Sequence, residues 1–176
     1  MQPLHSGRLR MSTSPLKENQ HVDAIQLLKN DHKEMKALLE ELAATTARAV
    51  KTRTELVGKI KTNLTAHATI EEQIFYPAYR DAGGKEQEKM YFEALEEHRA
   101  AKDLVLADLV KTDPSTEQFS GRAKVLKELI EHHIEEEEQD MFKQAKQLIE
   151  PAQLKSLGSA MHQLKDELLL KLKKAA

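Results

Sequence analysis

The 176-residue sequence contains no cysteine and no tryptophan, and it has only 6 glycines and 5 prolines. Without cysteine, the chain can form neither disulfides nor thiolate-based iron–sulfur or zinc sites. The scarcity of helix breakers, with many Ala, Glu, Lys and Leu residues, is typical of an all-helical protein. No apolar run approaches the roughly 20 residues that span a bilayer, so we expect no membrane partner.

Charges of the two signs nearly balance, and the formal net charge is −2 with histidine neutral. This balance excludes a large basic field, so we expect no nucleic-acid partner. Residues 1–20 are polar and lack the apolar stretch of a signal peptide. We expect them to form a disordered leader, and we expect the protein to be cytoplasmic.

Turn and capping signals divide the rest of the chain into helical segments. Asp81 is followed by Ala82 and two glycines, which is a strong helix stop, and Asp113-Pro114 precedes a helix start. The expected helices cover residues 21–45, 50–80, 85–111, 115–149 and 151–173. Short connections between long helices favour antiparallel neighbours. The sequence therefore predicts an all-α fold, an up-down antiparallel four-helix bundle over residues 21–149 with an additional short C-terminal helix in residues 150–176.

Each of the four bundle segments carries an apolar stripe in steps of three and four residues. Every stripe includes a histidine, and in two of them a glutamate follows one turn later. Ionisable groups are rarely buried unless they are paired, so these intrusions require a common cause. The stripe residues are Val22, Ile25, Leu28, His32, Met35, Leu39 and Leu42; Val57, Ile60, Leu64, His67, Glu71, Ile74 and Ala78; Tyr91, Leu95, His98, Val105 and Leu109; and Ala123, Leu126, Ile130, His133, Glu137 and Met141.

The four stripe histidines lie at similar distances from the loops that connect their helices. In an antiparallel bundle that distance sets the depth of a residue, and the mismatches amount to at most about a turn and a half. We therefore predict that all four imidazoles face one axis at nearly one level. Glu71 and Glu137 each follow a histidine by four residues, so they share its helix face.

Four imidazoles and two carboxylates at one place are a ligand set for metal ions. Nitrogen and oxygen donors without thiolate suit iron, manganese, zinc or copper, and geometry and metal availability decide among them. Six protein ligands exceed what one tetrahedral zinc uses. Two metals that share bridging carboxylates and a water-derived oxygen would use all six, with positions left for a small molecule such as dioxygen or nitric oxide.

These residues resemble the hemerythrin or HHE cation-binding domain over residues 24–147. The stretch from His67 to Pro77, H-A-T-I-E-E-Q-I-F-Y-P, is similar to the family pattern, and the stretch from His133 to Phe142 repeats it. The resemblance implies two non-haem iron ions, bridged by oxo or hydroxo groups and by carboxylates. It further implies oxygen or nitric oxide binding or sensing, iron homeostasis or stress defence. The implied metal ligands are His32, His67, Glu71, His98, His133 and Glu137.

The sequence departs from the oxygen-carrying members of this family at two positions. They have a second histidine one turn after the third-helix histidine, where this chain has Lys102. They also use a His-x4-Asp pair on the last helix, where this chain offers a His-x3-Glu pair, His133 and Glu137. Lys102 either turns outward to solvent or hydrogen-bonds a metal-bound oxygen. His132 offers the same spacing to Glu136 as His133 does to Glu137, but the apolar stripe favours His133.

Three functions remain open from the sequence. The first is a di-iron protein that binds or senses a small ligand without enzymatic turnover. The second is a ferritin-like oxidase or peroxidase, against which the lack of Glu-x-x-His motifs counts. The third is a metal-free helical interaction module. The last helix either caps the bundle or forms a dimer interface, so we expect a monomer or a weak homodimer.

Overall fold

The computed structural model describes residues 22–175, so the predicted leader and His21 lie outside the described part of the chain. Every element within residues 22–175 is helical, which confirms the all-α prediction. The elements are α1 (Ala24–Ala43), α2 (Val50–Ile70), η1 (Glu71–Phe75), α3 (Tyr76–Ala82), α4 (Lys85–His98), η2 (Arg99–Leu106), α5 (Ala107–Val110), α6 (Glu117–Glu136), η3 (Glu137–Met141), α7 (Phe142–Leu148) and α8 (Pro151–Ala175).

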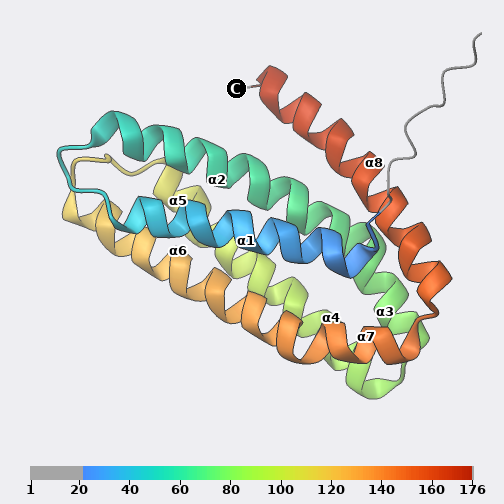
Figure 1. Cartoon of the computed structure of the whole chain (residues 1–176). Helices are drawn as coiled ribbons and strands as arrows, with labels where there is room; N and C mark the ends of the chain where they lie inside the picture. Colours follow the sequence, from blue (N-terminus) through green and yellow to red (C-terminus); the bar gives the residue numbers. More distant parts are fainter. Residues whose placement is uncertain (1–21, 176) are drawn as a thin grey trace, which may run out of the picture.

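Four rods make up the bundle, and three of them contain a short π-helical segment (Figure 1). The rods are α1, α2–η1–α3, α4–η2–α5 and α6–η3–α7. Each rod contacts the next, and the last contacts α1, so the four surround one axis in alternating directions. None of the helices in the described range is long and apolar enough to cross a membrane.

Local side chains fix where the helices begin and how the loops meet. The Asp23 carboxylate accepts a hydrogen bond from the backbone of α1 at 2.9 Å, and Thr116 caps α6 in the same way at 3.2 Å. At the loop end of the bundle, buried Arg53 donates hydrogen bonds to Thr45 and to the Pro114 carbonyl. These bonds join the α1–α2 loop to the loop that precedes α6.

Two apolar clusters occupy the two ends of the bundle. One is built around Phe75, Tyr79 and Phe142, and the other around Leu39, Leu56 and further aliphatic side chains of all four rods. Apolar burial contributes about 25 cal/mol per Å², so these clusters supply most of the stability. The histidines lie between the two clusters.

The π-helical segments change which residues face the core. A stripe in steps of three and four predicted Ile74, Ala78 and Val105 as core positions, but all three are only half-buried. In their place Phe75, Tyr79 and Leu106 are buried, at 0 %, 0 % and 2 % exposure. The prediction was wrong here because a π turn holds one more residue than an α turn and rotates the following helix face.

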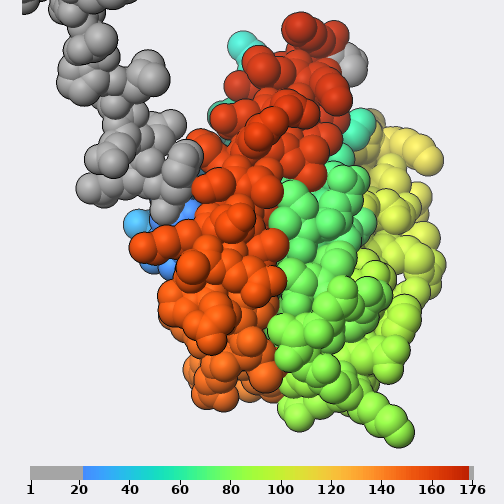
Figure 2. Space-filling model, turned by 90° about the vertical axis from the view of Figure 1, so that its right-hand side faces the viewer, coloured from blue at the N-terminus to red at the C-terminus, as the bar shows by residue number. Residues whose placement is uncertain are grey.

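The C-terminal helix α8 packs across α1, α2 and η1 (Figure 2). It is 25 residues long, and Leu154 and Met161 are buried in the cluster that contains Phe75. A Cβ atom on Gly158 would lie 2.4 Å from the Val22 carbonyl oxygen. Glycine is therefore required where α8 crosses the start of α1, and the described helix caps this end of the bundle.

We predict that Gly158→Ala destabilises the protein, because the clash is with backbone and no side chain can move aside. The matched control is Gly121→Ala in α6, where an added Cβ meets nothing within 4 Å. Alanine in an exposed helix interior is favoured by up to about 1 kcal/mol. Urea unfolding should therefore move in opposite directions for the two variants, and equal shifts would contradict the close approach.

Candidate metal centre

The six residues singled out by the sequence meet in the middle of the bundle. His32 comes from α1, His67 from α2, His98 from α4 and His133 from α6. Each is at most 6 % exposed. The two carboxylates, Glu71 and Glu137, are the first residues of η1 and η3 and are 0 % and 2 % exposed. His132 points away from this place, with a side chain that is 64 % exposed.

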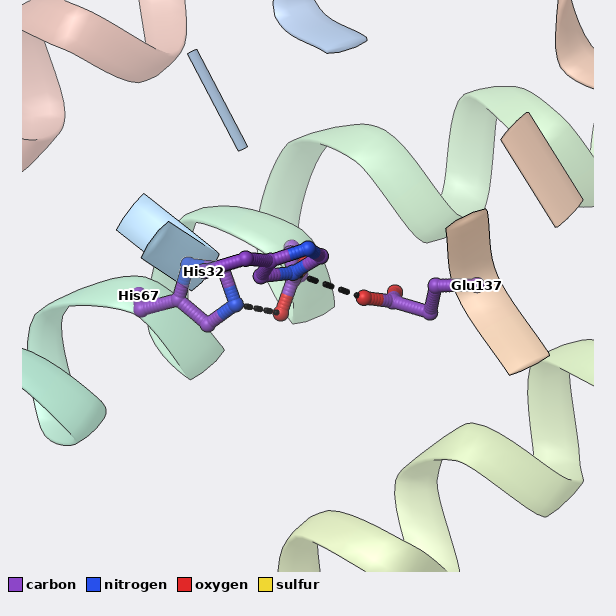
Figure 3. Close-up of side chains that lie close together, drawn as sticks. His32, His67 and Glu137 are labelled. Carbon is purple, nitrogen blue, oxygen red and sulfur yellow. Dashed lines mark ion pairs between the residues drawn. The ribbon is translucent and has the colours of Figure 1, made fainter. Parts of the chain in front are cut away.

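Ring nitrogens and carboxylate oxygens approach one another closely in this cluster (Figure 3). His32 Nε2 lies 3.1 Å from Glu137 Oε2, and His67 Nε2 lies 3.1 Å from Glu71 Oε2. His98 Nε2 lies 3.3 Å from the same Glu71 oxygen, and His98 and His133 bring their Nε2 atoms to 3.1 Å. Donors about 2.1 Å from one shared cation would be separated by about 3 Å, as these atoms are.

Two overlapping groups of donors can each hold a cation. One group is His32, His67, Glu71 and Glu137, and the other is Glu71, His98 and His133. Within each group the ligand atoms lie within 4.8 Å of one another. Glu71 belongs to both, which is the arrangement expected of a carboxylate that bridges two metals.

Unpartnered polar atoms test whether the cluster fits metal ions. Across residues 22–175, four buried side-chain nitrogen or oxygen atoms lack a hydrogen-bond partner: His32 Nε2, both carboxylate oxygens of Glu71 and Glu137 Oε2. Leaving such atoms unsatisfied costs about 1–3 kcal/mol each, and more for charged groups. All four belong to the proposed ligands, so the donor set fits bound cations.

A second ring of carboxylates holds the histidines from behind. Each imidazole directs Nε2 toward the centre and pairs its Nδ1 with a carboxylate. This pairing fixes the orientation of the ring and raises its basicity as a metal ligand. The pairs are His32 with Glu138 at 2.9 Å, His67 with Asp31 at 3.4 Å, His98 with Glu72 at 3.0 Å and His133 with Glu97 at 2.6 Å.

Comparison with known proteins agrees with this geometry. The sequence matches the family model of the hemerythrin HHE cation binding domain over residues 23–145. The chain belongs to the hemerythrin HHE cation-binding family. Its fold is similar to the crystal structure of a hemerythrin HHE cation binding domain-containing protein from Mycobacterium kansasii, with a TM-score of 0.74 and 27 % identity over 85 % of this chain and 89 % of that one.

A second relative is a longer protein. The chain is 26 % identical over 138 residues to a DNA nickase from Nostoc sp. (strain PCC 7120 / SAG 25.82 / UTEX 2576). The match covers 78 % of this chain but 37 % of that relative, so the chain spans little more than a third of its length. The shared part is therefore comparable in size to one HHE domain.

The centre of this HHE domain is built from two similar halves. The Asp31-His32 pair in α1 recurs as Glu97-His98 in α4, and the run from His67 to Glu72 recurs from His133 to Glu138. Every residue follows its counterpart at the same separation along the chain. Each half is a helical hairpin that supplies two histidines, one central carboxylate and two outer carboxylates.

Sequence reasoning missed the outer carboxylates. Glu72 and Glu138 each directly follow a candidate ligand glutamate, and in the sequence alone they resemble ordinary solvated acidic residues. Glu72 and Glu138 are instead half-buried partners of His98 and His32. The signal that could have found the other two is their position directly before a ligand histidine, as in Asp31-His32 and Glu97-His98.

Two lysines complete this outer ring. Lys102, which replaces the histidine of oxygen carriers, places its Nζ 3.2 Å from Glu72 and thereby contacts the partner of His98. Lys165 of α8 lies 2.5 Å from Asp31, the partner of His67. Lys102 thus forms an ion pair with the carboxylate behind His98, a contact that neither expectation for this lysine included.

Tyr76 is the other residue that sequence reasoning missed, because the shift in helix register at η1 turns it inward. It is fully buried, and its hydroxyl donates a hydrogen bond to Glu137 Oε1 at 2.9 Å. The same hydroxyl lies 3.4 Å from His98 Nε2 and 3.3 Å from His133 Nε2. The hydroxyl therefore lies among the ligand atoms, and burial raises the pKa of Tyr76 well above its usual value.

The two central carboxylates have pKa values shifted in opposite directions. Burial, followed by the charge of Glu137, raises the pKa of Glu71 well above its usual value. Burial alone would also raise the pKa of Glu137, but the charge of His133 and the contact with His32 outweigh it and hold that pKa low. Adjacent buried carboxylates resist ionising together, so a cation bound between them would compete with protonation of Glu71.

We predict that His67 stays neutral in the metal-free protein well below the usual pKa of histidine. Burial lowers its pKa from 6.5 to about 4, although Asp31 partly opposes the shift. Between pH 6.5 and about 4 the unfolded chain binds a proton at His67 and the folded protein does not, so unfolding takes up a proton. The stability contributed by His67 is therefore present above pH 6.5 and is lost as the pH falls toward 4. Histidine ¹⁵N NMR at pH 5.5 checks this, and a protonated His67 ring would contradict it.

Proposed function

We propose that this HHE domain holds two iron ions between its two helical hairpins and uses them to bind a small neutral molecule, dioxygen or nitric oxide. The observation that carries the proposal is the bridging position of Glu71, which belongs to both donor groups. Imidazole and carboxylate donors without thiolate suit iron, whose redox activity and Lewis acidity would act on the small ligand. Binding for sensing or stress defence follows more naturally than steady-state turnover.

A small void beside the histidines supports a diatomic ligand. It has a volume of about 10 Å³ and is lined by the four candidate ligand histidines, by Glu97 and by apolar side chains that include Met35, Leu64, Ala101 and Ile130. A site of this size holds about one water-sized molecule. Its apolar wall favours a neutral diatomic molecule over an ion, because a charged ligand would lose its hydration there.

The two alternative functions have less support. In a ferritin-like centre a glutamate precedes histidine by three residues, but here Leu64, Leu95 and Ile130 stand at that spacing. A metal-free interaction module would bury four unpartnered polar atoms without compensation. We do not assign the nickase activity of the Nostoc relative to this chain, because its net charge of −2 leaves no excess of basic groups to contact DNA phosphates.

One prediction of the proposed function concerns the metal content of the purified protein. Protein purified without oxygen should carry about two irons per chain, and its visible absorption should change on exposure to air. Glu71→Gln keeps the shape of the side chain but removes the bridging charge, so we expect at most about one iron. The exposed His162→Ala is the control and should keep the full complement.

Mass spectrometry of the metals, together with absorption spectra, measures both effects. Full occupancy by zinc, or metal-free protein from iron-replete cells, would overturn the assignment of iron. Glu71→Gln protein with two irons would refute the bridging role. Supercoiled plasmid provides a further comparison, and we expect the iron-loaded domain to leave it intact.

The second prediction concerns the small void. Ala101→Leu should fill the void, because the larger side chain occupies the space beside the histidines. Nitric oxide should then bind the reduced iron protein about tenfold or more weakly, since the diatomic ligand no longer fits there. Iron content should remain unchanged, since Ala101 carries no donor. Ala160→Leu, at an exposed position of α8, is the control. Unchanged nitric oxide affinity in Ala101→Leu would place the ligand elsewhere.

A further inference from the structure

A second, larger hollow connects the surface with the buried ligands. It has a volume of about 300 Å³ and lies between α4 and the α6–η3–α7 rod. His133 and Glu137, two of the six proposed ligands, form part of its wall. Its other lining residues are Glu86, Lys89, Met90, Glu93, Ala94, Glu97, Glu136, Asp140, Met141 and Gln144. Because two candidate ligands form part of its wall, the hollow extends from the surface to the centre.

The charge of this hollow is strongly one-sided. Six carboxyl side chains line it, against the single basic group of Lys89. A cleft lined by charges of one sign concentrates ions of the opposite sign and speeds their association. Dioxygen and nitric oxide gain nothing from such a field, and anions are repelled by it. The chemistry of the wall selects a cation.

Three side chains at the mouth of this hollow form a donor group of their own. Glu97, His132 and Glu136 each offer a ligand atom, and these atoms lie within 4.8 Å of one another. His132 Nε2 lies 3.4 Å from Glu136 and 3.9 Å from Glu97. Glu97 also holds His133 by its Nδ1 at 2.6 Å, so this outer group is one residue away from the buried ligands.

An unpartnered acceptor marks the inner end of the route. The Glu137 side chain is 2 % exposed, lines the hollow, and leaves its Oε2 without a hydrogen-bond donor. A cation that enters between α4 and η3 thus meets a buried carboxylate oxygen that accepts no hydrogen bond and lies 3.1 Å from His32 Nε2. This observation is independent of the carboxylates at the mouth.

The repeat within the bundle explains why this side of the centre stays open. Asp31 is the counterpart of Glu97, but Asp31 is covered by α8 and neutralised by Lys165 at 2.5 Å. The helix that supplies Lys165 packs on α1, α2 and η1, whereas the residues that line the hollow come from α4 and the α6–η3–α7 rod. Glu97 has no such cover and faces the acidic hollow instead. One of two related approaches is closed by a positive charge, and the other is lined by negative charge.

We propose that the hollow between α4 and the α6–η3–α7 rod is the entry route for divalent metal, and that Glu97, His132 and Glu136 hold the incoming cation briefly before it passes to the buried ligands. The proposal rests on the metal-binding function proposed above. It assigns a role to His132 and to acidic residues that the centre itself does not use as ligands.

The test measures the rate at which metal-free protein takes up Fe²⁺ in the absence of oxygen. The double variant Glu93→Gln/Glu136→Gln removes two charges from the route, one of them in the brief binding site. It leaves the six buried ligands and the carboxylates paired with their Nδ1 atoms unchanged. We expect uptake at low salt to slow by roughly tenfold and the difference to shrink at high salt. The final iron content should equal that of the wild type.

A matched control removes the same charge from another hollow. Another hollow, of about 360 Å³, is lined by none of the six proposed ligands. Its charged lining residues are Lys36, Glu131, Glu135 and Glu138. Glu131→Gln/Glu135→Gln should therefore take up Fe²⁺ at close to the wild-type rate. His132→Ala should slow uptake most at low Fe²⁺ concentration, where the brief binding site matters.

The outcomes separate the two proposals. If both double variants slow Fe²⁺ uptake equally, the effect comes from net charge alone and the proposed entry route is wrong. The route is also wrong if Glu93→Gln/Glu136→Gln and His132→Ala both take up Fe²⁺ at the wild-type rate. In either case, full final iron content would leave the proposed metal centre standing. If wild-type protein takes up no Fe²⁺ at all, the proposed function itself fails.

Discussion

The structure depends on one constraint: polar side chains that water would normally satisfy are buried together in the middle of an apolar bundle. Two hydrophobic clusters close the bundle above and below the histidines, so these side chains are removed from bulk solvent at both ends of the bundle. The outer carboxylates satisfy only the Nδ1 side of each ring. The inward-facing donors are compatible with a stable fold when a cation is shared among them, and family membership agrees with that reading.

Much of this arrangement could be predicted from residue spacing. An ionisable side chain on an apolar stripe is conspicuous, so His32 and its three counterparts could be found and placed at one depth. Helix boundaries followed from Gly83-Gly84 and Pro114. The register beyond Glu71 could not be predicted, because no residue type announces a π turn. That turn brings Tyr76 into contact with the candidate ligand atoms. The outer carboxylates were equally hidden, since an acidic residue beside a ligand looks like an ordinary solvated one.

The near-twofold repeat makes the role of α8 intelligible. Two similar hairpins would by themselves produce a centre with two equivalent outer faces. Packing of α8 across α1 and α2, with Gly158 allowing the close approach, breaks that equivalence. Lys165 then places a permanent positive charge behind one histidine, while the related carboxylate on the other hairpin keeps its negative surroundings. A helix without any ligand thus gives the centre a closed side and an open side.

The exchange of carboxylates between the hairpins has a mechanical consequence. Glu71 belongs to the first hairpin but lies 3.3 Å from His98 of the second, and Glu137 belongs to the second but lies 3.1 Å from His32 of the first. Each cation would therefore cross-link segments that are remote along the chain. Metal occupancy would tighten the seam between the two halves more than either half internally, so metal loss would loosen hairpin against hairpin before any single helix frays.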